Sequence, residues 1–163
     1  MAAMARRGAA ASLIALAVLL IDQGSKLWAS RSFPPRRQVA LISGWLWVLV
    51  QRNSGTSFGV FAGNNGLFIA VTLLAVGVAA LLVVRRYVTG SLGTAGLGLI
   101  AGGALGNLVD RVRLGAVTDF LELRGWPAVF NPADAAIRIG VVLLLAGLLL
   151  QWRRPLARPP GRG

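Results

Sequence analysis

The chain has 163 residues, of which 56% are hydrophobic and 13% are charged, and its mean hydropathy is +0.70. These values are typical of an integral membrane protein, and the length favours one membrane domain over residues 1–163. The sequence has no cysteine and no histidine, which excludes disulfides, thiolate nucleophiles, imidazole bases and the usual zinc sites. Any chemistry must therefore come from carboxylates, hydroxyls, amides, lysine or arginine, and we expect no metal or cofactor.

The seventeen lysine and arginine residues outnumber the five acids, which gives a net charge of +12. The arginines occur in small groups beside apolar runs, for example Arg6 with Arg7 and Arg153 with Arg154. This distribution suits anionic headgroups and helix orientation better than a continuous phosphate-binding face. We therefore expect membrane phospholipid, and no nucleic acid, as a partner.

Apolar runs long enough to cross the hydrocarbon core, which takes about 20 residues, occur at residues 9–28, 67–84, 92–109 and 135–152. The predicted fold class is therefore membrane all-α, with four transmembrane helices. In the third run Gly102 and Gly106 have the G-x-x-x-G spacing, which predicts close packing against a neighbouring helix. A cleaved signal peptide is the alternative for the first run, but the run continues into Asp22 and Lys26 without a clear A-x-A site.

The connection over residues 29–66 carries a strand pattern. Apolar residues alternate on both sides of Ser43 and Gly44, which predicts two short strands joined by a turn, with Trp45 and Trp47 on one face. Tryptophan favours the headgroup layer, so we expect the indoles to face lipid there. A loop or a short interfacial helix is the alternative.

Orientation follows from the order of insertion, because the basic residues divide evenly between the two sides. Arg6 and Arg7 enter first, and the short connection between the second and third runs holds no acid. We therefore expect both termini in the cytoplasm, with residues 29–66 and 110–134 on the outer side.

All five acids are then predicted on the outer side of the membrane: Asp22, Asp110, Asp119, Glu122 and Asp134. Carboxylates at or inside a bilayer are costly and indicate a functional site. Simpler explanations exist for most of them. Asp22 and Lys26 have the spacing of a helical ion pair, and Asn107, Asp110 and Arg111 fit a polar helix end.

Asp134 also fits a helix cap. Asn131 is a good N-cap, Pro132 suits the first helical position, and Asp134 then lies at the third, with Arg138 one turn further on as its expected partner. Capping does not explain Asp119, which lies among apolar residues in a predicted loop. The loop is short, so we expect Asp119 to lie near Asp134.

Five short motifs occur in order: DQGSK at 22–26, NSGTSF at 53–58, GGALGNLVDR at 102–111, GAVTDF at 115–120 and FNPAD at 130–134. Through these motifs nearly the whole chain resembles the lipoprotein signal peptidases of type two, bacterial membrane aspartyl proteases with four transmembrane helices. The resemblance implies a small extracytoplasmic β-cradle between the first two helices. The chain departs from the family pattern at two positions. Thr56 stands where the family motif often has alanine, and Arg138 stands where a small or apolar residue is expected.

The resemblance implies that the chain cleaves a prolipoprotein signal peptide before a cysteine bearing a diacylglyceryl group, at the outer face of the bacterial cytoplasmic membrane. A monomer is expected. Asp119 and Asp134 take the positions of the catalytic aspartates. Eight other positions match the family and are expected to shape the pocket, hold substrate or support the site. They are Asn53, Gly103, Asn107, Asp110, Arg111, Asn131, Asp22 and Lys26.

Paired carboxylates are also a chemically credible route to amide hydrolysis without histidine, cysteine or metal. Such a pair should share one proton, with Asp119 as its expected holder. A serine–lysine pair is the alternative, but Lys26 has only Ser25 and Ser30 nearby and no oxyanion signature. Outside proteolysis, a proton-coupled transporter needs an acid near mid-membrane, and an assembly factor leaves the clustered acids unused.

Overall fold

The computed structural model describes residues 2–55, 64–85 and 87–153. Within them, four helices are long and apolar enough to cross a membrane, which confirms the predicted helical bundle. In chain order they are α1 (Ala2–Ser32), α2 (Asn65–Val84), α3 (Ser91–Leu114) and α4 (Pro132–Trp152). The helices extend past the predicted apolar runs, most of all α1 and α3, because their polar ends continue the backbone hydrogen bonding beyond the lipid-facing segment.

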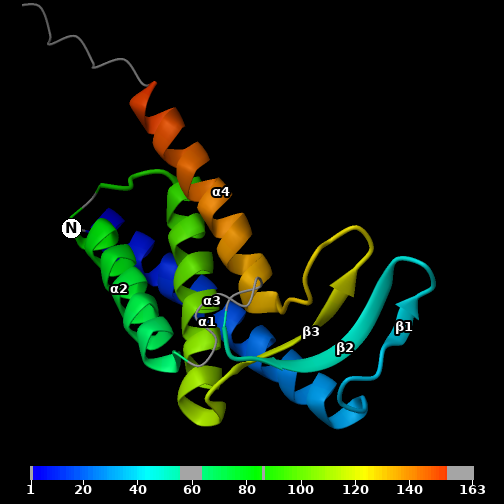
Figure 1. Cartoon of the computed structure of the whole chain (residues 1–163). Helices are drawn as coiled ribbons and strands as arrows, with labels where there is room; N and C mark the ends of the chain where they lie inside the picture. Colours follow the sequence, from blue (N-terminus) through cyan, green and yellow to red (C-terminus); the bar gives the residue numbers. More distant parts are fainter. Residues whose placement is uncertain (1, 56–63, 86, 154–163) are drawn as a thin grey trace, which may run out of the picture.

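Helix α3 lies at the centre of the bundle and contacts the other three helices, whereas α1 and α2 scarcely touch (Figure 1). Glycines permit this close packing. A Cβ atom at Gly96 would lie 2.6 Å from the carbonyl oxygen of Gly140 in α4, and one at Gly102 would lie 2.5 Å from that of Ala15 in α1. The predicted role of Gly102 in close helix packing is therefore confirmed.

A three-stranded antiparallel sheet lies at one end of the bundle, in the order β1 (Val39–Ile42), β2 (Leu46–Asn53) and β3 (Val117–Leu123) (Figure 1). The predicted hairpin is confirmed, and Gly44 adopts a left-handed φ of 74° in its turn. Trp45 lies in this turn and is exposed, whereas Trp47 lies on β2 and is half-buried, and a shared face for the two indoles stays a prediction.

The third strand was not predicted. Residues 117–123 were expected to be a loop, and that expectation was wrong, because β3 pairs with the otherwise free edge of β2, including Asp119 opposite Gln51. Val48 and Phe120 pack with Ala29 of α1 in a small apolar core beneath the sheet. Asp119 is therefore carried on a strand packed against α1.

The close contact of α3 with α4 predicts a difference between two glycines. Gly96→Ala should lower the free energy of unfolding of the detergent-solubilised protein by about 1–3 kcal/mol, because the added methyl group meets backbone atoms of α4. The measurement is the melting temperature. The control is Gly77→Ala in α2, where an added Cβ meets nothing within 4 Å. Equal melting temperatures for the two variants would contradict the packing described.

Candidate active site

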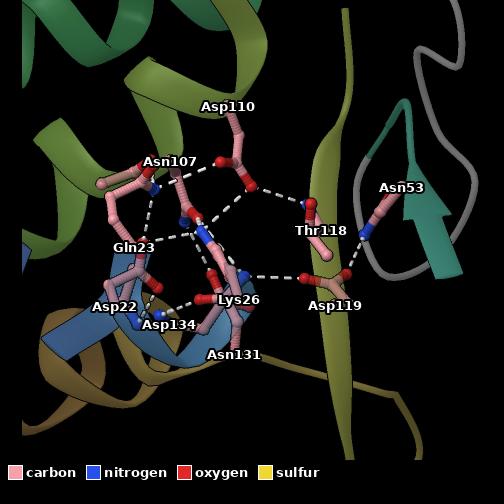
Figure 2. Close-up of polar contacts among 12 residues, drawn as sticks. Asp22, Gln23, Lys26, Asn53, Asn107, Asp110, Thr118, Asp119, Asn131 and Asp134 are labelled. Carbon is pink, nitrogen blue, oxygen red and sulfur yellow. Dashed lines mark hydrogen bonds and ion pairs between the residues drawn. The ribbon is translucent and has the colours of Figure 1, made fainter. Parts of the chain in front are cut away.

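The polar residues predicted to form a site converge where the sheet meets α1, α3 and the start of α4 (Figure 2). Hydrogen bonds and ion pairs join eight of the predicted residues: Asp22, Lys26, Asn53, Asn107, Asp110, Asp119, Asn131 and Asp134. Two residues that sequence reasoning missed, Gln23 and Thr118, belong to the same network.

Asp119 lies on β3, is only 1% exposed, and is held by the side-chain amides of two other residues. Its Oδ2 accepts a hydrogen bond from Asn53 Nδ2 at 2.9 Å, and its Oδ1 accepts one from Asn131 Nδ2 at 2.7 Å. Burial raises the pKa of Asp119 to about 6. The nearby charge of Asp134 also raises this pKa, whereas the two amides and Lys26 lower it. Near neutral pH Asp119 is therefore poised to exchange a proton.

Asp134 lies in the first turn of α4. Its backbone N–H donates to Asn131 Oδ1 at 2.9 Å, which confirms the predicted N-cap. Its Oδ1 accepts from Asn107 Nδ2 at 2.9 Å. Because the capping side chain of Asn131 also donates to Asp119, one residue both caps α4 and links the two acids. Capping and a paired-acid role are thus compatible.

Arg138 does not pair with Asp134, contrary to the sequence-based expectation. In the described part of the chain both ion pairs involve Lys26, and the Arg138 guanidinium lies 5.2 Å from the ring centre of Trp126 and 5.9 Å from that of Phe130. A planar guanidinium stacks well on aromatic faces. Arg138 therefore ties α4 to the connection after β3 and leaves the Asp134 carboxylate to Asn107.

Lys26 is buried behind the two proposed catalytic acids, among side chains that do not themselves bond to Asp119. Its Nζ lies 2.8 Å from Asp22 Oδ2 and 3.2 Å from Asp110 Oδ2, so the predicted Asp22–Lys26 pair is confirmed and extended. Nζ also donates to Asn107 Oδ1 at 3.0 Å. This bond fixes the amide of Asn107 so that its Nδ2 faces Asp134.

The two remaining predicted site residues lie at the edge of this network. A Cβ at Gly103 would lie 2.5 Å from the Ala133 carbonyl oxygen, so Gly103 allows α3 to approach the start of α4. The Arg111 guanidinium lies 4.9 Å from the ring centre of Phe68 in α2, and the binding of substrate by Arg111 stays a prediction. Thr56 lies outside the described residues, as does the rest of its motif to residue 58.

Little in the sequence marks Gln23 or Thr118. Gln23 is a single amide within a helix, and Thr118 takes part through its backbone N–H as well as its hydroxyl. The available signal was that they lie beside Asp22 and Asp119, inside the motifs DQGSK and GAVTDF. Within the described residues, no three side chains of the types that commonly bind metals are placed to hold one ion.

The sequence profile of signal peptidase (SPase) II matches residues 14–150. The chain belongs to the signal peptidase II family. It is 43% identical over 139 residues to a lipoprotein signal peptidase of Syntrophomonas wolfei, covering 85% of this chain and 92% of that one. It is likewise 43% identical over 149 residues to a lipoprotein signal peptidase of Moorella thermoacetica, with 88% and 97% covered.

Solved structures agree with this assignment. A bacterial membrane enzyme determined at 2.3 Å by the in meso method has a TM-score of 0.84 and 26% identity, covering 94% of this chain and 95% of that one. A second, determined at 1.9 Å, has a TM-score of 0.78 and 28% identity, covering 86% and 93%. The four helices and the sheet are thus the architecture of this signal peptidase II chain.

The raised pKa of Asp119 predicts a carboxyl group that is protonated below about pH 6 and ionised above it. Infrared difference spectra between pH 5 and pH 8 should show a carboxylic acid band that disappears in Asp119→Asn. Glu122→Gln is the control and should keep the band, since Glu122 lies on the sheet edge, bonded to Gln38. A band that survives in Asp119→Asn would assign the proton to another group.

Proposed function

We propose that this signal peptidase II chain is an aspartic endopeptidase that removes the signal peptide from diacylglyceryl-modified prolipoproteins, cutting before the lipidated cysteine. One observation carries the proposal. The Asn131 side chain joins Asp119 on β3 to Asp134 on α4, since it donates to the Asp119 carboxylate and accepts from the Asp134 backbone N–H where the apolar helices end. Membership of the family supports it, as do the relatives described as lipoprotein signal peptidases.

The proposed reaction uses the two aspartates in different protonation states. The Asp134 carboxylate takes a proton from a water molecule while the water oxygen attacks the scissile carbonyl carbon. Neutral Asp119 gives its proton to the carbonyl oxygen, which produces a tetrahedral gem-diol. Asp134 then passes its proton to the amide nitrogen, the C–N bond breaks, and a gem-diol hydroxyl returns a proton to Asp119. Both acids end the cycle as they began.

The surrounding amides support this division of roles. Asn53 and Asn131 donate to Asp119, and Asn107 donates to Asp134. Among the described residues no cation is in direct contact with either carboxylate. Burial keeps the pKa of Asp119 raised to about 6, which suits a proton donor near neutral pH. In this proposal Arg111 and Gly103 shape the substrate pocket at its edge.

The positions of the acids favour proteolysis over transport or assembly. A proton-coupled carrier places its acid inside a span near mid-membrane. Here Asp119 lies on a strand outside the helices, and Asp134 lies in the first turn of α4. An assembly factor has no need for two acids held by three amides.

We further propose that the chain is a monomer in the bacterial cytoplasmic membrane, bathed by phospholipid, with both termini in the cytoplasm. The sheet and the two acids then face the outer side. The four apolar helices support a multi-pass membrane protein, and the early position of Arg6 and Arg7 supports this orientation.

Asp119→Asn and Asp134→Asn should each lower the cleavage rate by about 10²- to 10⁴-fold, because each removes one proton-transfer step. The assay is cleavage of a diacylglyceryl-modified prolipoprotein by the purified protein in detergent, beside the unlipidated precursor. Glu122→Gln is the matched control and should keep most of the activity. Rapid turnover by either asparagine variant would refute the pair, and equal cleavage of both substrates would refute the lipid requirement.

Single cysteines report the orientation cleanly, because the natural chain has none. A membrane-impermeant thiol reagent applied to intact cells should label Ser32→Cys, at the end of α1, and should not label Ser91→Cys, at the start of α3. The reverse pattern would place the active site on the cytoplasmic side.

A further inference from the structure

Each proposed catalytic aspartate follows a residue whose backbone N–H is bound by another, buried aspartate. The N–H of Thr118, directly before Asp119, donates to Asp110 Oδ2 at 2.8 Å. The N–H of Ala133, directly before Asp134, donates to Asp22 Oδ1 at 3.0 Å. Asp110 lies on α3 and Asp22 on α1, so each catalytic strand or helix is anchored to a different membrane helix.

These two anchoring aspartates are themselves joined by a cation and an amide (Figure 2). Lys26 Nζ lies 2.8 Å from Asp22 and 3.2 Å from Asp110. Gln23 Nε2 lies 3.1 Å from Asp22 Oδ2 and 3.2 Å from Asp110 Oδ1, and it also donates to the carbonyl oxygen of Gly106 at 3.1 Å. A Cβ at Gly106 would lie 2.5 Å from Asp22 Oδ2, so the absence of a side chain there leaves room for the carboxylate.

We propose that Asp22 and Asp110, bridged by Lys26 and Gln23, form a positioning pair that sets the separation of Asp119 and Asp134. The continuous path runs from Asp119 through the Thr118 N–H to Asp110, across the bridge to Asp22, and through the Ala133 N–H to Asp134. This inference rests on the proposed function, since it concerns the geometry of that reaction. The two anchoring aspartates and the two residues that bridge them are positioning residues and do not touch the reacting atoms.

The burial of the cluster suits it to this task. Asp22 is 0% exposed, Lys26 4% and Asp110 3%, and no buried side-chain polar atom of the described residues lacks a hydrogen-bond partner. A fully satisfied buried polar network is rigid, because moving one member leaves others unpaired. Rigidity matters here, since a misplacement of about 1 Å at reacting groups costs about 10²-fold in rate.

Gln23→Met tests the bridge while every charge is kept. Methionine has a similar length but no donor, so Asp22 and Asp110 lose one link and the spacing of the catalytic acids loosens. We expect kcat on the lipid-modified substrate to fall by about 10- to 100-fold with KM within about twofold of the parent. The pH profile of kcat should also change, because the strand that carries Asp119, whose pKa burial raises to about 6, is held less firmly in place.

Gln151→Met is the matched control. Gln151 also ties elements together through its amide, bonding Tyr87 and Thr89, but at the far end of α4. It should keep the parent kcat and pH profile even if it lowers the melting temperature. If Gln23→Met keeps the parent kcat and pH profile, or if both variants lose activity only in proportion to lost stability, the positioning pair is refuted.

Hydrogen exchange separates this inference from the proposed function. Peptides covering Thr118 and Ala133 should exchange faster in Gln23→Met than in the parent and the Gln151→Met control, whether or not the parent cleaves the substrate. A parent that fails to cleave would refute the proposed function alone. Unchanged exchange at both amides in Gln23→Met would refute the positioning pair alone.

Discussion

The buried ammonium group of Lys26 is the interaction on which the rest of the site depends. It lies within ion-pair distance of two buried carboxylates, Asp22 and Asp110, and without it both charges would be uncompensated in the interior. It also bonds Asn107 Oδ1, which leaves the Asn107 amide nitrogen to donate to Asp134. One cation therefore pairs with both anchoring acids and orients a group that holds a proposed catalytic acid.

In the described part of the chain, the side chains that bond to the proposed catalytic acids are neutral amides. Asn53, Asn107 and Asn131 each donate to a carboxylate oxygen, and Asn131 uses both ends of its side chain. A lysine or arginine in direct contact with Asp119 would favour its ionised form and lower its pKa. Neutral amides orient the carboxylate while lowering its pKa less, so the pKa of Asp119 stays raised, at about 6. The charged Lys26 lies one residue further from the acids, and Asp119 can still exchange a proton near neutral pH.

Local signals in the sequence account for what could be predicted. The apolar runs identify the helices, the alternation about Ser43 and Gly44 identifies the hairpin, and Asn131 with Pro132 identifies the start of α4. The motifs also indicated which acids and amides gather at one end. All of these signals are local, because each depends on a few consecutive residues.

The features that were missed depend on contacts between distant segments. β3 forms because β2 offers a free edge more than sixty residues earlier in the chain, as the pairing of Gln51 with Asp119 shows. Helical spacing predicted Arg138 as a partner for Asp134, but the Arg138 guanidinium lies over the rings of Trp126 and Phe130 in the preceding connection. Gln23 gains its role only when α1 and α3 bring Asp22, Gly106 and Asp110 around one amide.

The central claim is that Asp119 and Asp134 act as one catalytic unit. The direct measurement is the single-turnover cleavage rate of the Asp119→Asn/Asp134→Asn double variant beside each single variant, with enzyme in excess over lipid-modified prolipoprotein. Groups that act as a unit lose their effect together, so the double variant should cleave no more slowly than the slower single variant. Losses that multiply in the double variant would show that the two acids act independently, and would contradict the account.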